Sequence, residues 1–180
     1  MTAKSILLEL VSPDGATIGT AEKLSAHQPP GRLHRAFSVF LFDATDRMLL
    51  QRRALTKYHS PGVWSNTCCG HPLPGEPPAA AAARRTHEEL GLTPTAVVPA
   101  GTVTYNHPDT ISGLVEWEYN HLYVGRADHL LQPDPNEVHE TLFASPDDLT
   151  RMLAQQPFSS WFRTVLAAAL PEIRRLAPNW

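Results

Sequence analysis

One stretch near the middle of the chain, residues 69–92, constrains the fold most strongly. It reads CGHPLPGEPPAAAAARRTHEELGL, with a thiol and an imidazole at its head and paired prolines before an alanine-rich run. Strong helix formers fill 79–90, and proline is tolerated in the first turn of a helix. Gly91 lies where a C-cap glycine belongs. The stretch therefore predicts a loop, a helix over 79–90 and a sharp turn.

Strand patterns lie on both sides of this helix. Apolar and β-branched residues dominate six predicted strands, which are 5–11, 34–43, 48–53, 96–105, 114–125 and 138–144. Residues 17–20 are expected to pair back as a hairpin, whereas 21–33 and 54–66 are expected to be irregular.

Two further helices are predicted near the end of the chain. Ser145 is a suitable N-cap with Pro146 at the first helical position. A last helix over 161–176 is expected to be interrupted or kinked at Pro171. Strands, a central helix, more strands and then helices predict one compact mixed α/β domain over residues 1–180.

Composition narrows the class of protein. The chain has 180 residues, of which 42% are hydrophobic and 18% charged, and a net charge of −3. That charge argues against a nucleic-acid or anionic-membrane surface over the whole molecule. No apolar run approaches the roughly 18 residues that span a bilayer, and the N-terminus does not read as a signal peptide, so we expect a cytoplasmic protein.

The two cysteines, Cys68 and Cys69, are adjacent in the sequence. A disulfide between neighbours is strained, so a disulfide framework is excluded. A cytosolic cysteine near a histidine is more often reactive or linked to a metal. Cys68 is interpreted as a small buried hydrophobic residue.

Charged residues are concentrated on the predicted helix. Arg84 and Glu88, and Arg85 and Glu89, are four residues apart, so each pair is adjacent on a helix surface. Taken alone, these pairs are equally compatible with a solvated helix face.

A second set of residues suggests a metal site. Glu116 and Glu118 are two residues apart on a predicted strand, so both carboxylates project from one partly buried face and require a cation or a proton between them. With His27, His34 and His71 they would form an N/O-ligated divalent site suited to manganese, magnesium, iron or zinc. The alternative is that each histidine is an ordinary surface or core residue. We keep that interpretation for the remaining six, which are His59, His87, His107, His121, His129 and His139.

The spacing of the central stretch resembles the Nudix box. Gly70 is followed after five residues by Glu76, after seven more by Arg84, and then by Glu88-Glu89-Leu90-Gly91-Leu92. The resemblance implies an α/β/α sandwich with a mixed sheet, a divalent metal and a diphosphate substrate. Arg85 and Thr86 depart from the box, because they replace a glutamate and a hydrophobic residue. A cation there weakens a hydrolytic metal site but suits a phosphate.

Beyond the box, residues 4–165 resemble the type 1 isopentenyl diphosphate isomerases, a branch of the Nudix superfamily. The pattern Lys-x3-His-x6-His, the Cys-Gly-His and the Glu-x-Glu occur in the order of that family. The resemblance implies conversion of isopentenyl diphosphate to dimethylallyl diphosphate, through a carbocation-like intermediate, in isoprenoid biosynthesis. The altered box is what that branch shows.

The resemblance also implies roles for individual residues. Cys69 and Glu118 correspond to the acid and base, in an order that spacing does not settle, and Tyr105 to a tyrosine bonded to that glutamate. Trp161 would place its π face against the cation; otherwise it is the hydrophobic anchor of the last helix. His27, His34, His71, Glu116 and Glu118 would bind one ion (Mn²⁺, Zn²⁺ or Mg²⁺). Glu89 and the Cys69 carbonyl would bind Mg²⁺ with the substrate. The implied diphosphate-binding residues are Lys23, Arg53, Lys57 and Arg85.

Two other functions remain as alternatives. A Nudix pyrophosphohydrolase of a nucleotide derivative would leave Cys69 without a role, and a non-catalytic diphosphate-binding module would leave both Cys69 and Trp161 unexplained. We expect a small-molecule enzyme that binds neither nucleic acid nor membrane, as a monomer or a weak homodimer.

Overall fold

A computed structural model describes residues 6–57, 59–128 and 130–180 of the chain. The strands in these ranges are β1 (Leu7–Val11), β2 (Thr17–Glu22), β3 (His34–Phe42), β4 (Met48–Arg53), β5 (Trp64–Ser65), β6 (Cys68–Gly70), β7 (Thr95–Pro108), β8 (Val115–Arg126) and β9 (Val138–Ala144). The helices are α1 (Lys23–His27), α2 (Pro78–Leu90), α3 (Pro146–Gln155) and α4 (Phe162–Leu176).

Local signals in the sequence set most of these boundaries. Gly91 ends α2 in the left-handed conformation at φ 67°, and its N–H donates to the His87 carbonyl. Ser145 caps α3, where its side chain accepts from the Asp148 N–H and the Asp148 carboxylate accepts from the Ser145 N–H. The predicted helix over 79–90 and the predicted cap at Ser145 are therefore confirmed. Ser5, at the start of the first predicted strand, lies outside the described residues.

Three short elements were not predicted. Residues 21–33 contain α1, where the Glu22 side chain accepts from the Ser25 N–H. The connection 54–66 contains β5, and the stretch that opens the Nudix-like box contains β6. Elements of two to five residues are too short to show a hydrophobic period, so pattern reading misses them.

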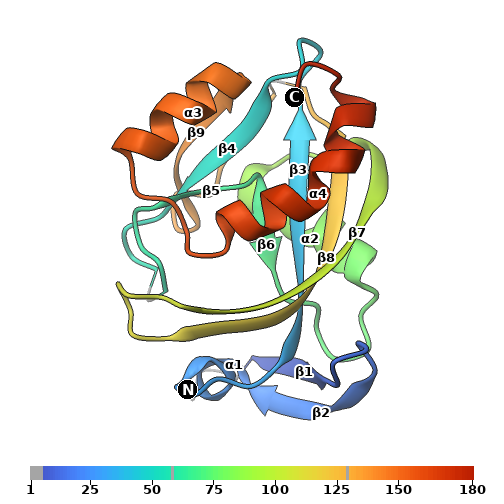
Figure 1. The fold of residues 1–180 in the computed structure, drawn as a ribbon, viewed down its shortest axis with the longest axis vertical. Helices are drawn as coiled ribbons and strands as arrows, with labels where there is room; N and C mark the ends of the chain where they lie inside the picture. The colour runs from blue at the N-terminus through green and yellow to red at the C-terminus, as the bar shows by residue number, and fades with distance from the viewer. Residues whose placement is uncertain (1–5, 58, 129) are drawn as a thin grey trace.

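The last helix differs from its prediction in one respect. α4 continues through Pro171 to Leu176, so an interruption there is wrong. Its axis changes direction along its length (Figure 1), as expected where proline removes one helical hydrogen bond.

A mixed sheet is built around β3. This strand runs parallel to β8 over its whole length and antiparallel to β1, β4 and β6. β7 and β9 extend the sheet beyond β8 and β4. β6 and β8 pair with β3, so segments that are distant in the sequence lie side by side in the sheet (Figure 1).

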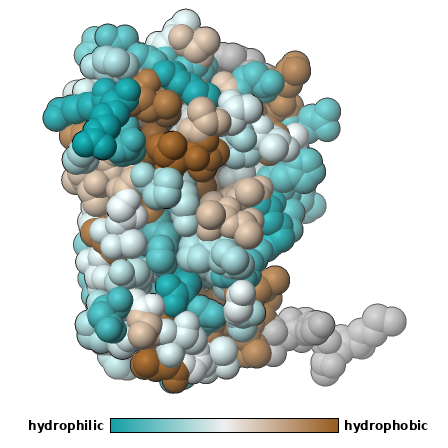
Figure 2. Space-filling view, turned by 90° about the vertical axis from the view of Figure 1, so that its right-hand side faces the viewer, coloured by the Kyte–Doolittle hydropathy of each residue, from teal (hydrophilic) through white to brown (hydrophobic). Residues whose placement is uncertain are grey.

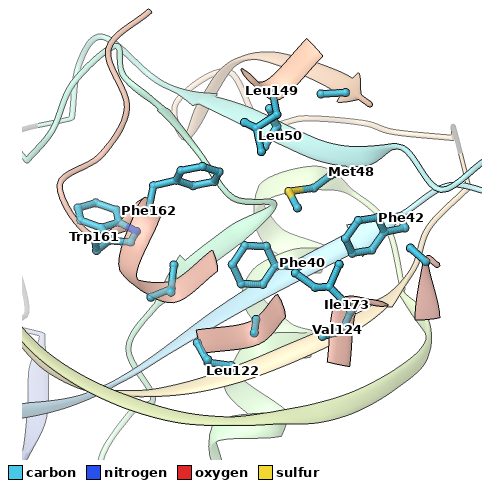
Figure 3. Close-up of a cluster of buried hydrophobic side chains, with 14 of the residues drawn as sticks. Phe40, Phe42, Met48, Leu50, Leu122, Val124, Leu149, Trp161, Phe162 and Ile173 are labelled. Carbon is cyan, nitrogen blue, oxygen red and sulfur yellow. The ribbon is translucent and has the colours of Figure 1, made fainter. Parts of the chain in front are cut away.

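Helices cover both faces of the sheet. On one face, α3 and α4 pack over a cluster that includes Phe40, Met48 and Phe162 (Figure 3). On the other face, Ala81 and Ala82 of α2 pack over Phe37, Val39 and Leu41 of β3. Alternate residues of β3 therefore supply both cores, as the two-residue period of a strand requires.

Polar and apolar side chains are mixed on the face of the molecule shown in Figure 2. On the face shown in Figure 2, apolar side chains form small groups separated by polar ones. Across the described residues, none of the helices combines the length and apolar character needed to cross a bilayer.

Candidate active site

A pocket of about 400 Å³ lies at the end of the sheet where β6, β8 and the start of α4 come together. Most of the predicted site residues line it, namely Lys23, Arg53, Lys57, Cys69, His71, Arg85, Glu89, Glu116, Glu118 and Trp161. His27, His34 and Tyr105 do not line it and are buried directly behind these residues. The structure thus gathers residues from 23 to 161 around one cavity.

The predicted histidines and carboxylates form one cluster. Donor atoms of His27, His34, His71, Glu116 and Glu118 all lie within 4.8 Å of one another. Strand register explains the arrangement, because His34 at the start of β3 pairs with Glu118 on β8. Glu116 and Glu118 share one buried face of β8, with exposed fractions of 3% and 6%, as their spacing predicts.

The histidines of this cluster turn lone pairs inward. Nδ1 of His27 lies 2.7 Å from the Lys23 carbonyl, and Nδ1 of His34 lies 2.7 Å from the Arg32 carbonyl. A carbonyl only accepts, so each Nδ1 carries the proton and each Nε2 presents a lone pair. Burial lowers the pKa of both His27 and His71, which keeps these imidazoles neutral.

The carboxylates face these lone pairs with little to neutralise them. Glu116 Oε2 lies 3.2 Å from His27 Nε2, and neither atom has a hydrogen-bond partner within the described residues. Burial and the neighbouring Glu118 raise the pKa of Glu116 well above its usual range. Buried acceptors that converge in this way are costly without a cation. The donor set therefore fits a divalent ion with nitrogen and oxygen ligands.

Cys69 and Glu118 project from the two strands that flank β3. Cys69 pairs with Ser38 through β6, and Glu118 pairs with His34 through β8. Their partners on β3 are four residues apart, so the two backbone positions are about 10 Å apart across the sheet and roughly 13 Å apart along it. Both side chains line the same pocket, so a small molecule has room between them.

The surroundings of Cys69 favour the thiol over the thiolate. Burial raises the pKa of Cys69 to about 12, although Arg53 opposes the rise. Cys68, its neighbour on the strand, points to the opposite face and is fully buried against α2. The interpretation of Cys68 as a buried hydrophobic residue is confirmed, and its Sγ also lies 3.6 Å from a Glu89 oxygen.

Tyr105 contacts Glu118 directly. The two residues are register partners on β7 and β8, and the Tyr105 hydroxyl donates a short hydrogen bond to Glu118 Oε2. Asn120 Nδ2 donates to the same Oε2 and to the Tyr105 hydroxyl, each at 3.0 Å. This network fixes the orientation of the Glu118 carboxylate.

Trp161 forms the apolar wall of the pocket at the start of α4 (Figure 3). It is 4% exposed and belongs to the core cluster that also holds Tyr105 and Phe162. The packing role of Trp161 is confirmed by this burial, whereas its role toward a cation stays a prediction for a side chain that also lines the pocket.

Among the described residues, five cationic side chains line the pocket, namely the four predicted diphosphate-binding residues and Arg84. The side chains of Lys23, Arg53, Lys57 and Arg85 all line it. Burial and the three neighbouring cations lower the pKa of Lys23. Burial would lower the pKa of Arg85 as well, but Glu89 and Glu137 raise it. These cationic groups suit a multiply charged anion, and Glu89, Glu116, Glu118 and Glu137 line the same pocket.

Glu89 lies among these cations and is 3% exposed. Arg85 Nη2 lies 2.7 Å from Glu89 Oε1, and Gln51 Nε2 donates to Glu89 Oε2 at 2.9 Å. Arg85 also lies 3.2 Å from Glu137. Arg85 is thus held at the pocket by carboxylates on α2 and on the segment before β9.

Several residues of the site were missed by sequence reasoning. His59, interpreted as a surface or core histidine, lines the pocket with Nε2 2.9 Å from Glu116 Oε1. Glu137 contacts Lys57 and Arg85, and Asn120 contacts Glu118. Asn120 shares the strand parity of Glu116 and Glu118, which was a usable signal; the loop residues His59 and Glu137 had none. Of the other histidines, His129 lies outside the described residues.

Comparison with known proteins agrees with this geometry. A model of the NUDIX domain matches residues 32–167. The chain is 69% identical to the isopentenyl-diphosphate Delta-isomerase of Streptomyces coelicolor over 97% of this chain and 89% of that protein. The protein of the same name from Halorhodospira halophila is 44% identical over 87% of this chain and 91% of that one.

Solved structures agree on the fold. DR0079 from Deinococcus radiodurans superposes with a TM-score of 0.71 at 21% identity, over 94% of this chain and 98% of that one. The MutT protein from Methanosarcina mazei superposes with a TM-score of 0.61 at 18% identity, over 78% and 94%. The predicted sandwich with a mixed sheet is therefore confirmed. The chain belongs to the Nudix superfamily and, within it, to the isopentenyl-diphosphate Delta-isomerase family.

Proposed function

We propose that this protein interconverts isopentenyl diphosphate and dimethylallyl diphosphate, as one catalytic domain whose reacting groups come from residues 23–161. The observation that carries the proposal is that Cys69 on β6 and Glu118 on β8, the two strands beside β3, line one pocket that Lys23, Arg53, Lys57 and Arg85 also line. A relative at 69% identity is named isopentenyl-diphosphate Delta-isomerase, which supports the same substrate and a role in isoprenoid biosynthesis.

The reaction needs two proton transfers. One carbon of the unactivated double bond gains a proton, and the next carbon but one loses a proton, which moves the bond by one position. The electron deficiency between the two steps lies at a tertiary carbon. Cys69 and Glu118 are positioned to give one proton and to take the other. Tyr105 and Asn120 hold the Glu118 carboxylate for that exchange.

Trp161 has a clear role in this chemistry. Trp161 lines the pocket in which the positive charge would develop, and an aromatic face attracts such a charge by about 0.5–2 kcal/mol. The positive charge of Arg53 already lies 5.6 Å from the ring centroid. An apolar side chain at this place would also limit the access of water to a carbocation.

The cationic side chains of the pocket would hold the diphosphate. Lys23, Arg53, Lys57 and Arg85 supply charge, and Arg85 can offer a planar pair of donors. Glu89 and the Cys69 carbonyl would hold Mg²⁺ that arrives with the substrate. The cluster of His27, His34, His71, Glu116 and Glu118 would hold Mn²⁺, Zn²⁺ or Mg²⁺ and so neutralise its carboxylates.

The main competing function, hydrolysis of a nucleoside diphosphate derivative, is less well supported. Arg85 occupies a position at which the hydrolytic box needs a glutamate, and its guanidinium neutralises Glu89 at 2.7 Å. A hydrolase of this superfamily would also make no use of the Cys69 thiol.

A product assay separates the two functions. The purified protein is incubated with Mg²⁺, Mn²⁺ and either isopentenyl diphosphate or a panel of nucleoside diphosphate derivatives. We expect the allylic isomer from the first substrate and no phosphate release from any. Phosphate release from a nucleotide, with isopentenyl diphosphate unchanged, would overturn the proposal.

A further inference from the structure

Asp109, a residue outside the pocket, lies at the end of the β7–β8 hairpin and is 4% exposed. Its Oδ2 accepts hydrogen bonds from the Ser60 N–H at 3.1 Å, the Ser60 hydroxyl at 3.0 Å and the Ser112 hydroxyl at 2.5 Å. Its Oδ1 accepts from the Ile111 N–H at 3.1 Å. These bonds join the hairpin to the connection between β4 and β5.

Ser60 needs this support. Its φ is 45°, in the left-handed region that residues other than glycine, asparagine and aspartate rarely adopt. Such a conformation costs on the order of 1–3 kcal/mol and persists only where the surroundings hold it. Two hydrogen bonds to Asp109, one from the backbone and one from the side chain, provide that hold.

The conformation of Ser60 directs two carbonyls at Arg53. Arg53 Nε donates to the Ser60 carbonyl at 3.0 Å, and Nη2 donates to the His59 carbonyl at 2.9 Å. These bonds fix the plane of the Arg53 guanidinium in the pocket. If Asp109 releases Ser60, both acceptors move and Arg53 loses its orientation.

The same segment also reaches the metal cluster. Nε2 of His59 lies 2.9 Å from Glu116 Oε1 and 3.4 Å from Asp109 Oδ2. The His59 ring therefore lies between Asp109 and a carboxylate of the cluster. Partners of this kind orient a metal ligand without binding the ion themselves.

We propose that Asp109 is a positioning residue that acts through Ser60 on Arg53 and through His59 on Glu116. It thereby fixes the position of Arg53, a proposed diphosphate-binding residue, relative to Glu116 in the metal cluster. The Ser60 branch rests on the proposed isomerase function, whereas the His59 branch concerns ion binding alone.

The test compares Asp109→Asn with the matched control Asp43→Asn. Asp43 is also buried, at 1% exposed, and also bonds two backbone N–H groups of its own turn, but it lies outside the pocket lining. Each variant is assayed for KM and kcat with isopentenyl diphosphate, for Mn²⁺ affinity by titration calorimetry and for Tm. We expect Asp109→Asn to weaken Mn²⁺ binding at least tenfold, in the range of about 10–100-fold seen for such partners, and to raise KM.

Asp43→Asn should lower Tm and leave KM, kcat and Mn²⁺ affinity unchanged. The proposal is overturned if Asp109→Asn changes only Tm, or if Asp43→Asn changes KM and Mn²⁺ affinity as much as Asp109→Asn does.

Two single-branch variants keep the test decisive if Asp109→Asn does not fold. Ser60→Ala should raise KM and leave Mn²⁺ affinity unchanged, whereas His59→Gln should weaken Mn²⁺ binding. Unchanged Mn²⁺ affinity in His59→Gln, together with unchanged KM in Ser60→Ala, would overturn the proposal. If the wild type does not isomerise isopentenyl diphosphate, the proposed function fails, and the Mn²⁺ titrations still decide the His59 branch.

Discussion

Burial favours the thiol form of Cys69, although cationic side chains that would favour a thiolate line the same pocket. Burial raises its pKa to about 12, and Glu89 and Glu118 add to the rise, while Arg53 and Lys57 oppose it. At neutral pH the side chain is therefore a neutral thiol, and the carboxylate of Glu118 lies on the other side of β3. A neutral thiol can give a proton to an alkene carbon, and it carries no charge that must be buried before that step.

Removing this thiol tests its role. We expect Cys69→Ala to lower kcat by about 10³-fold, within the range for loss of a positioned acid or base. The adjacent variant Cys68→Ala is the control, because Cys68 faces α2 and not the pocket. It should keep most of the activity at a lower Tm. Equal turnover in Cys69→Ala and wild type, measured by product formation, would remove Cys69 from the reaction.

Much of the site was predictable residue by residue, since the Cys-Gly-His, the Glu-x-Glu and the lysine–histidine spacing survive as local patterns. Tyr105 is the least local of these predictions, and the structure places it opposite Glu118 in the β7–β8 register. His59 and Asp109 could not be predicted in this way. Their contacts depend on how a loop before β5 meets a hairpin about 50 residues later, which no local spacing encodes.

At the scale of elements, the end of α2 shows how one residue positions part of the pocket. Gly91 has φ 67°, and an added Cβ would lie 2.7 Å from Gln132 Cβ and 2.8 Å from the Gln132 carbonyl oxygen. The last turn of α2 also carries Glu89, whose carbonyl accepts from the Asp134 N–H at 2.9 Å. The turn after α2 therefore connects the last turn of the helix, which carries Glu89, to the segment before β9.

We therefore expect Gly91→Ala to lower the free energy of unfolding by more than the strain of a left-handed alanine alone. Strain costs about 1–2 kcal/mol, and the contact with Gln132 adds to it. Gly101→Ala is the control, because Gly101 has φ 94° but an added Cβ there would meet no atom within 4 Å. Urea unfolding should show a larger loss for Gly91→Ala. Equal losses would mean that the approach to Gln132 has no energetic weight.

The turn between β3 and β4 predicts a pH dependence. Burial alone would raise the pKa of Asp43, but hydrogen bonds from Arg47 and Thr45 lower it to about 2. A depressed folded-state pKa stabilises the fold above the unfolded pKa of about 3.9, and this contribution falls as pH drops toward 2. The stability gap between wild type and Asp43→Asn should thus be larger at pH 5 than at pH 3. Urea unfolding at both pH values measures it, and a gap that grows at pH 3 would refute the assignment.

The short elements mark where sequence reading stops. α1, β5 and β6 together place His27, the segment beside Arg53, and Cys69, yet none of them is longer than five residues. Their positions follow from tertiary pairing, such as Gly70 with Phe37, and not from a hydrophobic period. The long strands and α2 were predictable because their patterns extend over several turns or pleats.

At the scale of the whole molecule, the metal cluster joins parts of the chain that are distant in sequence. Its ligands come from α1, β3, the end of β6 and β8, between residues 27 and 118. An ion that binds only the folded arrangement stabilises it by mass action. The cluster should therefore contribute to global stability and not only to catalysis.

Calorimetry in EDTA and in Mn²⁺ measures this contribution. With Mn²⁺ at about 100 times its Kd, the gain is about 2.7 kcal/mol, which raises Tm by several degrees. Glu116→Gln should lose most of the increase, because it removes one ligand charge. A Tm that is the same in EDTA and in Mn²⁺ would show that this cluster does not bind the ion in the folded protein.

We propose that this pocket shifts a double bond by adding one proton and removing another, and that the diphosphate stays intact. Incubation of the protein with isopentenyl diphosphate, Mg²⁺ and Mn²⁺ in D₂O, followed by NMR of the products, tests it most directly. The account predicts dimethylallyl diphosphate that carries deuterium at carbon, no free phosphate, and loss of both product and label in Cys69→Ala and Glu118→Gln. Released phosphate without an allylic product, or an allylic product free of deuterium, would contradict it.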